Sequence, residues 1–481
     1  GEYCIVKGGM YIKMPLGSGN LSVVGDGAGQ SVIKYREDWE PYGTWVALRF
    51  MPERTPRTTE EYLHDITISD LSVYDTDPVK HAWTVEENGA KEETHGFDIQ
   101  FCRRATVKNC SVINVGDEAI DMVYCLDSLI SENTVLGSPG AGSAGGAISV
   151  GDGCNNIRVI NNCVNGTIAD SSKSNFGIAV EALTGKVENI TITGNTISNV
   201  NGYGINIGAP RGTIYSVNCS GNIITDCKNG IRIMGSGIKS GINISNSTIR
   251  NVENGIICEN SNTSEVLING FVIENVFGAR AISFETPNIQ NVIISDGVIN
   301  SCQCAAVYSA ATDFKMRNIK IDGSGLAGGI KTAAVLQYVY GGYSEVSDIT
   351  IKNCQNSKGI QGVQTVINAV IEQPDTVAFV SINGAKYIRG GKVNRLVQGI
   401  KSGSVIDGLE ISTQADLGTH AIQMRDVSNC IITNCKISIP SRYAINEVGT
   451  SNYNLICNNF INGKIQISGA NTIATSNMVI K

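Results

Sequence analysis

A four-residue pattern recurs along the chain: a small residue, then Ile or Phe, one variable residue, and a second apolar residue. Successive copies lie 23 to 30 residues apart and begin at Gly96, Ala119, Ala147, Gly177, Gly204, Gly230, Gly255 and Ala281. A period of this length is typical of a solenoid, in which each repeat is one coil stacked on its neighbours and the loops absorb differences in length.

Each copy alternates inward apolar and outward positions, as a β-strand with one buried face does. Asn and Gly occupy the intervening turns, for example Asn133, Asn195 and Asn222, where stacked amides can hydrogen-bond from coil to coil. We therefore predict an all-β fold, a right-handed parallel β-helix forming a single domain over residues 1–481, with the hand taken from the general rule for parallel crossovers. Residues 34–64 and 75–94 depart from the repeat and are predicted to be N-terminal capping or insertion segments.

The net charge and the cysteine pattern limit which partners and which cellular compartment are expected. The formal net charge of −7 is opposite to the basic footprint of nucleic-acid-binding proteins, so no nucleic-acid partner is expected. No run of 18 apolar residues is present, so no membrane span is expected. The 15 cysteines form no Cys-x-x-Cys pairs, and several follow Asn in strand-like contexts, for example Cys110 and Cys163. This favours buried free thiols and assembly in a reducing cytoplasm, and we expect an extracellular or virion-associated (tail) protein.

Stacking the coils turns equivalent sequence positions into columns on one sheet. Asp98 and Asp121 occupy the same outward position in successive copies, so they should be neighbours about 4.8 Å apart. Asp117 and Glu118 precede the second copy, and His95 precedes the first. Carboxylates placed this close share a proton, bind a cation or face solvent, and such pairs also separate two pKa values for acid and base roles. The alternative is that these acids only cap turns on a solvated face.

The same region resembles a known enzyme family. The segments Glu93-Thr94-His95-Gly96-Phe97-Asp98 and Gly116-Asp117-Glu118-Ala119-Ile120 resemble the signature region of polygalacturonase-type glycoside hydrolases, and residues 14–29 are similar to the opening of pectate-lyase-like β-helix proteins, which include phage tailspike depolymerases. The resemblance implies that Asp117 and Glu118 match the paired catalytic acids. The third acid of that family falls on His95, and its histidine falls on Gly146.

The leading interpretation is a glycoside hydrolase that cleaves a bacterial surface or extracellular polysaccharide. Asp117 and Glu118 would act as general acid and as the group that activates water. Asp98 and Asp121 would tune this pair, and His95 would orient substrate or share a proton. The predicted substrate-binding residues are Glu181, Arg232, Trp83, Asp152 and Tyr203. Among these, Arg232 would bind an acidic sugar and Trp83 would pack on a sugar face.

Two alternatives remain open. A polysaccharide lyase would need a cation beside a uronate, and Asp98, Asp117, Glu118 and Asp121 could then hold Ca²⁺; otherwise no cofactor or metal is expected. A non-catalytic glycan-binding or structural tail protein is the other alternative. Outward apolar residues, Ile257 and Phe271, are compatible with a homotrimer.

Overall fold

The computed structural model describes most of the chain. The described residues are 2–5, 9–35, 44–75, 84–85, 91–137, 145–166, 175–259, 262–325, 333–338, 342–373, 379–412 and 420–480. They form two compact units, Gly1–Leu267 and Ile268–Lys481, and each unit is described by itself. Both are built from short β-strands, and the only helix among the described residues is one 3₁₀ turn, η1 (Thr59–Glu61).

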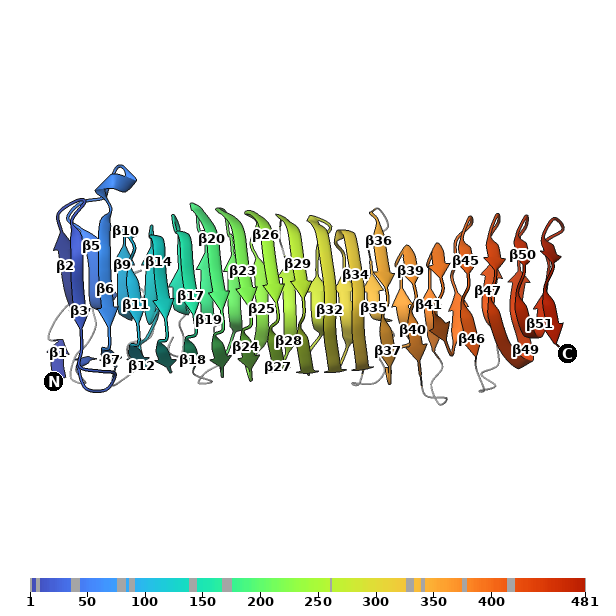
Figure 1. The fold of residues 1–481 in the computed structure, drawn as a ribbon, viewed down its shortest axis with the longest axis horizontal. Coiled ribbons are helices and arrows are strands. Elements are labelled where there is room, and N and C mark those ends of the chain that lie inside the picture. The colour runs from blue at the N-terminus through green and yellow to red at the C-terminus, as the bar shows by residue number, and fades with distance from the viewer. Residues whose placement is uncertain are drawn as a thin grey trace. The chain divides into compact units, whose positions relative to one another are not determined.

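In the first unit, each regular coil contributes strands to three parallel sheets. The first sheet carries β2 (Gly9–Met14), β5 (Thr44–Pro52), β9 (Lys91–Gln100), β13 (Ile120–Val123), β16 (Gly146–Val150), β19 (Phe176–Glu181), β22 (Tyr203–Gly208), β25 (Asn229–Met234) and β28 (Asn254–Glu259). Figure 1 shows these strands stacked coil upon coil.

The second and third sheets complete the coils. The second carries β3 (Gly19–Val24), β6 (Leu63–Ser69), β10 (Cys102–Arg103), β11 (Thr106–Lys108), β14 (Leu126–Ser131), β17 (Asn155–Ile160), β20 (Lys186–Thr193), β23 (Thr213–Ser220) and β26 (Ile238–Ser245). The third carries β1 (Glu2–Ile5), β4 (Val32–Tyr35), β7 (Ser72–Tyr74), β12 (Ser111–Ile113), β15 (Thr134–Leu136), β18 (Cys163–Asn165), β21 (Thr196–Ser198), β24 (Ile223–Thr225) and β27 (Thr248–Val252).

The second unit repeats this construction from β30 (Val272–Val276) to β53 (Met478–Ile480), again with parallel pairing between coils. In both units most Ile and Val side chains on the strands point inward and are almost fully buried, which confirms the predicted alternation. The expectation that Phe271 points outward is wrong. Its side chain is 1% exposed, and its ring lies against the backbone of Gly297, because the absence of a side chain there leaves room for the ring.

A ladder of buried asparagines lines one turn of the first unit. The Asn133 amide donates to Asn162 at 3.0 Å, Asn162 donates to Asn195 at 3.0 Å, and Asn195 donates to Asn222 at 3.0 Å. Each side-chain oxygen also accepts the backbone N–H of the asparagine one coil earlier. The predicted stacking of asparagines is therefore confirmed, and it satisfies backbone groups that the turn would otherwise bury without partners.

The described cysteines are free thiols, as expected, and most are buried. Cys110 occupies the ladder position one coil before Asn133, and its backbone N–H donates to the Asn133 oxygen at 3.0 Å. Cys163 is an exception to the expected burial. It begins β18, where Val164 takes the inward position, so the cysteine faces solvent.

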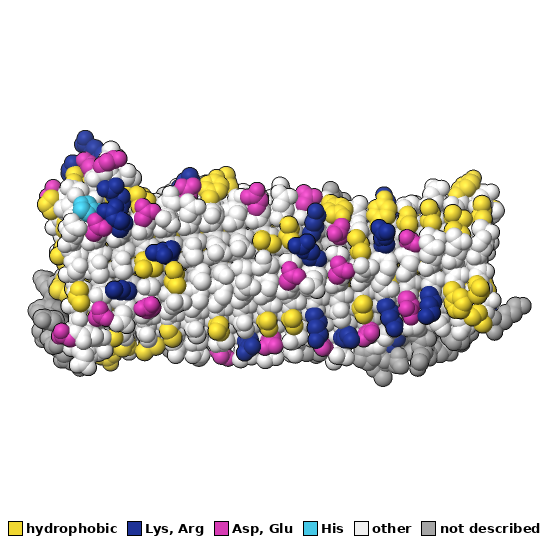
Figure 2. All heavy atoms as spheres, in the orientation of Figure 1, with side chains coloured by type: hydrophobic (Ala, Val, Ile, Leu, Met, Phe, Trp, Pro, Cys, Tyr) yellow, Lys and Arg dark blue, Asp and Glu magenta, His cyan; other side chains and the backbone are white. Residues whose placement is uncertain are grey.

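No helix among the described residues is long and apolar enough to cross a membrane. On the face shown in Figure 2, acidic and basic side chains are scattered among uncharged ones, and one group of Lys and Arg lies near the end that carries η1.

Candidate active site

The first sheet brings the predicted acidic residues together. In the register between β9 and β13, Asp98 lies directly opposite Asp121, as the sequence predicted. The same outward column continues along the first unit through Ser149, Ala179, Asn206, Arg232 and Ile257. It also extends in the other direction, because β5 pairs with β9 and places Arg49 opposite Asp98.

Arg49 supplies the positive charge that accompanies Asp98. The Arg49 Nε donates to Asp98 Oδ2 at 2.5 Å, and the Gln100 amide donates to the same oxygen at 3.2 Å. Asp98 is 1% exposed. Burial raises the pKa of Asp98 above its ordinary value, although the charge of Arg49 opposes this shift. Asp98 is therefore a buried, arginine-bound group rather than one open to solvent.

His95 and Glu118 form an ion pair across the turn before the two strands. The His95 Nδ1 lies 3.0 Å from Glu118 Oε2. The backbone of His95 is held by the buried hydroxyl of Tyr35, which donates to the His95 carbonyl oxygen at 2.7 Å. Burial alone would raise the pKa of Glu118, but the charge and hydrogen bond of His95, with a hydrogen bond from Asp117, hold it below its ordinary value. Glu118 is thus kept as a carboxylate.

A glycine makes room for the adjacent carboxylates. A Cβ on Gly145 would lie 2.1 Å from Asp117 Oδ1 and 2.8 Å from Glu118 Oε1, so any side chain at this position would displace them. Gly145 therefore allows the backbone before β16 to approach Asp117 and Glu118 closely.

Asp121 and Glu181 have the opposite electrostatic environment from Glu118. Burial and the carboxylates of Asp98 and Glu118 raise the pKa of Asp121 well above its ordinary value. Burial and the charge of Glu118 raise the pKa of Glu181 to about 7, against a hydrogen bond from the Asn206 amide at 3.1 Å. Glu181 lies at the end of β19, two coils from β13, and is protonated over much of the neutral pH range.

One group of donors could hold a metal ion. Ligand atoms of His95, Asp117 and Glu118 all lie within 4.8 Å of one another. Ca²⁺ takes six to eight oxygen ligands, whereas one of these three donors is an imidazole nitrogen, and Asp98 is already bound by Arg49. The donor set therefore does not fit the Ca²⁺ site that a lyase would need.

The other predicted substrate-binding residues have varied surroundings. The Arg232 Nε donates to Glu259 Oε1 at 2.6 Å, and its guanidinium carbon lies 4.5 Å from the Tyr203 ring centroid. Asp152 accepts from the Thr184 N–H at 3.2 Å, and its charge contributes to the raised pKa of Glu181. Trp83 lies outside the described residues. Arg232 and Tyr203 therefore stack on each other several coils beyond the carboxylates.

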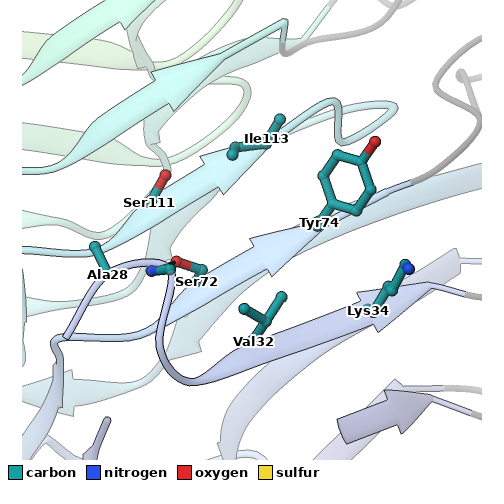
Figure 3. Close-up of a pocket in the computed structure, with 8 residues that line it drawn as sticks. Ala28, Val32, Lys34, Ser72, Tyr74, Ser111 and Ile113 are labelled. Carbon is teal, nitrogen blue, oxygen red and sulfur yellow. Dashed lines mark hydrogen bonds between the residues drawn. The ribbon is translucent and has the colours of Figure 1, made fainter. Parts of the chain in front are cut away.

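A separate concavity lies on the third sheet. It has a volume of about 410 Å³, and the turn at Ala28 and Gly29 forms part of its lining. Figure 3 shows its lining side by side on three neighbouring strands, Val32 and Lys34 on β4, Ser72 and Tyr74 on β7, and Ser111 and Ile113 on β12. None of these lining residues is acidic, so the carboxylates of the first sheet remain the candidate catalytic centre.

Comparisons with known proteins agree with the fold. Residues 79–240 match the family model of the right handed beta helix region. Together with the three parallel sheets, this match shows that the fold is a right-handed parallel β-helix, as the sequence predicted. No curated protein sequence matches it at a significant level.

Several solved structures are similar to this chain. An exopolygalacturonase from Thermotoga maritima matches over 67% of this chain and 84% of its own, with 13% identity and a TM-score of 0.49. The catalytic domain of a GH87 α-1,3-glucanase in complex with nigerose matches over 79% and 60%, with 13% identity and a TM-score of 0.37. The surface protein and adhesin PfbA of Streptococcus pneumoniae matches over 79% and 91%, with 12% identity and a TM-score of 0.33. Two of these similar structures are glycoside hydrolases and the third is an adhesin.

Proposed function

We propose that the chain is a glycoside hydrolase that cleaves a polysaccharide on the outer face of its first sheet. One observation carries the proposal: Glu118 and Glu181, whose charges interact, have pKa values displaced in opposite directions. The pKa of Glu118 is lowered by its pair with His95, and that of Glu181 is raised by burial to about 7. Such a separation is how a fold assigns base and acid roles to chemically similar groups.

The reaction follows from these two protonation states. Glu181, protonated near neutral pH, would donate its proton to the oxygen of the scissile glycosidic bond. Glu118, ionised and oriented by His95, would either attack the sugar carbon directly or accept a proton from the water that attacks it. Asp117 lies beside Glu118. The ion pair between Asp98 and Arg49 connects β9 to the neighbouring strand β5. The sequence favoured Asp117 and Glu118 as the catalytic pair, and this proposal replaces Asp117 with Glu181 as the partner of Glu118.

The test compares three variants on polysaccharides from bacterial capsules and cell surfaces. Glu118→Gln and Glu181→Gln should each lower the release of reducing ends by at least about 100-fold, because each removes one half of the acid–base pair. The matched control is Glu188→Gln, which makes the same chemical change at an ion pair with Lys186 on the second sheet and should behave like the parent protein.

The readouts separate the competing functions. Hydrolysis gives new reducing ends without unsaturated sugars, whereas a lyase gives a product that absorbs in the ultraviolet. If the parent protein binds a glycan but neither shortens it nor differs from the Glu118→Gln variant, the chain is a binding or structural protein and the proposal is wrong.

A further inference from the structure

The second unit carries a row of amide side chains on one of its sheets. The strands of this sheet are β31 (Arg280–Phe284), β33 (Ala305–Ser309), β35 (Ala333–Gln337), β38 (Lys358–Gln361), β41 (Val380–Asn383), β44 (Leu396–Gln398), β47 (His420–Arg425) and parts of β49 (Lys436–Val448) and β51 (Phe460–Gln466). In six successive coils the outward position is held by an amide, and these residues form the amide column: Gln361, Asn383, Gln398, Gln423, Asn446 and Gln466. Each of these side chains is half-buried and thus keeps contact with solvent.

The amide column differs from the buried asparagine ladder of the first unit. In the ladder each amide donates to the next at 3.0 Å, whereas no hydrogen bond among the described residues joins two members of the column. Gln361 and Asn446 each contact one basic side chain of the same sheet, Lys358 at 3.0 Å and His420 at 3.3 Å. Three members make no side-chain hydrogen bond within the part of the chain that the structure describes: Asn383, Gln398 and Gln466. Their donors and acceptors are therefore available to a ligand.

Glycines adjoin the column on one side. The first three amides are each followed by a glycine in the left-handed backbone region, Gly362, Gly384 and Gly399. A Cβ on Gly399 would lie 2.4 Å from Asn383 Oδ1, so the amide of one coil lies against the glycine of the next. These coils therefore present no side chain at the position next to the amide, and a ligand can approach the column closely from that side.

Two tyrosines lie on the coils that precede the column. Tyr308 occupies the same outward position two coils before Gln361, with Leu336 between them. Tyr338 directly follows β35 and is 65% exposed, and its ring centroid lies 6.3 Å from that of Tyr308. The Arg280 guanidinium carbon lies 3.8 Å from the centroid of the Tyr308 ring and covers part of it. Tyr338 is therefore the more open ring for a sugar face.

We propose that the amide column and Tyr338 bind a polysaccharide chain that lies lengthwise along the second unit. Adjacent amides are about 4.8 Å apart, which is on the scale of one sugar ring, so successive sugars can meet successive amides. Sugar hydroxyls donate and accept hydrogen bonds as amides do, and the apolar face of a sugar packs on a tyrosine ring. This binding involves no reaction, so the inference goes beyond the hydrolase function and does not depend on it.

The test measures binding of the full chain to soluble polysaccharides by affinity electrophoresis. The native gels contain dextran, soluble starch, galactomannan or a bacterial capsular polysaccharide, and every protein carries Glu118→Gln so that the polymer stays intact. Asn383→Ala combined with Gln398→Ala removes two amides, and Tyr338→Ala removes the exposed ring. Each change should weaken binding by about tenfold, because each removes direct contacts to the chain.

Two control variants make the same chemical changes elsewhere in the second unit. Gln290→Ala combined with Gln355→Ala removes two exposed amides outside the sheet that carries the column. Tyr387→Ala removes a tyrosine that is 41% exposed, on β42 (Tyr387–Arg389) of another sheet, with Lys386 Nζ 5.4 Å from its ring centroid. Both control variants should bind as tightly as the protein with Glu118→Gln only.

The outcomes separate this inference from the hydrolase function. Equal binding by the column variants and the controls, or no retardation by any of the polysaccharides, would overturn the inference. A changed sedimentation coefficient of the column variants would also overturn it, because the column would then be an interface between copies of the chain. Tyr338→Ala keeps the test valid if the amide variant is unstable, since that side chain is mostly exposed. Failure of the hydrolase function would leave the inference standing, because binding is measured without cleavage.

Discussion

The buried carboxyl of Glu181 makes the stability of the protein depend on pH in a defined direction. Its pKa rises from the ordinary 4.5 to about 7 in the folded protein, and this difference corresponds to about 3 kcal/mol. Because the folded pKa lies above the unfolded one, the folded state binds the proton more tightly. This contribution to stability is complete below pH 4.5 and is lost progressively as the pH rises through about 7.

Replacing Glu181 with Gln removes the titrating group but keeps the size and the contact with Asn206. Between pH 5 and pH 8, the parent protein should therefore lose about 2.5 kcal/mol of unfolding free energy relative to the Glu181→Gln variant. Urea unfolding followed by circular dichroism, at both pH values and for both proteins, measures this difference. Glu188→Gln is the control for the same change at an ion pair with Lys186 on the second sheet.

A difference between parent and Glu181→Gln that is the same at pH 5 and pH 8 would refute the reasoning, since it would place the folded pKa of Glu181 at its ordinary value. The same titration sets the upper limit of catalysis. If Glu181 is the general acid, hydrolysis should decline as the pH rises through about 7.

Three further perturbations test the surroundings of the site and the coils. Arg49→Gln leaves Asp98 buried without its charge partner and should lower the unfolding free energy by about 3 kcal/mol, measured by urea unfolding. The double variant that also carries Asp98→Asn should recover much of this stability, whereas an additive loss would contradict the account. Asn195→Ala interrupts the ladder and removes the partner of the Asn162 backbone N–H and of the Val159 carbonyl oxygen, so the unfolding free energy should fall by about 2–3 kcal/mol. A change below about 0.5 kcal/mol would show that the ladder is dispensable. Cys163 is the exposed one of the described cysteines and should react rapidly with a thiol reagent in the native protein, a signal that Cys163→Ser should remove.

Periodicity was enough to predict the neighbours within the first sheet. Asp98 and Asp121 occupy equivalent positions in successive copies of the repeat, and parallel pairing in register then places them side by side. The same logic predicted the asparagine ladder, because equivalent turn residues stack when coils stack. Arg49 was missed as a member of the column, although Ala47-Leu48-Arg49-Phe50 repeats the small–apolar–variable–apolar pattern with Leu in place of Ile.

Residues in turns could not be placed by periodicity. Gly145 lies against Asp117 and Glu118 because of the path of the chain before β16, and this close approach depends on backbone positions that no repeat specifies. The prediction for Phe271 failed for a related reason. The residue occupies a turn position, and its burial depends on Gly297 leaving space for the ring.

The sequence by itself determined the parallel β-helix, the stacking of its turns and the presence of Asp98 and Asp121 in one column, because all three follow from a local pattern repeated at a regular interval. Only the tertiary structure decided which acids are ionised and which are protonated. Those states depend on burial and on charges brought from other coils, such as Arg49 beside Asp98, His95 beside Glu118 and the Glu118 charge acting on Glu181. Proton affinity is a property of the assembled surroundings, so identical carboxyl groups in the sequence acquire different roles in the fold.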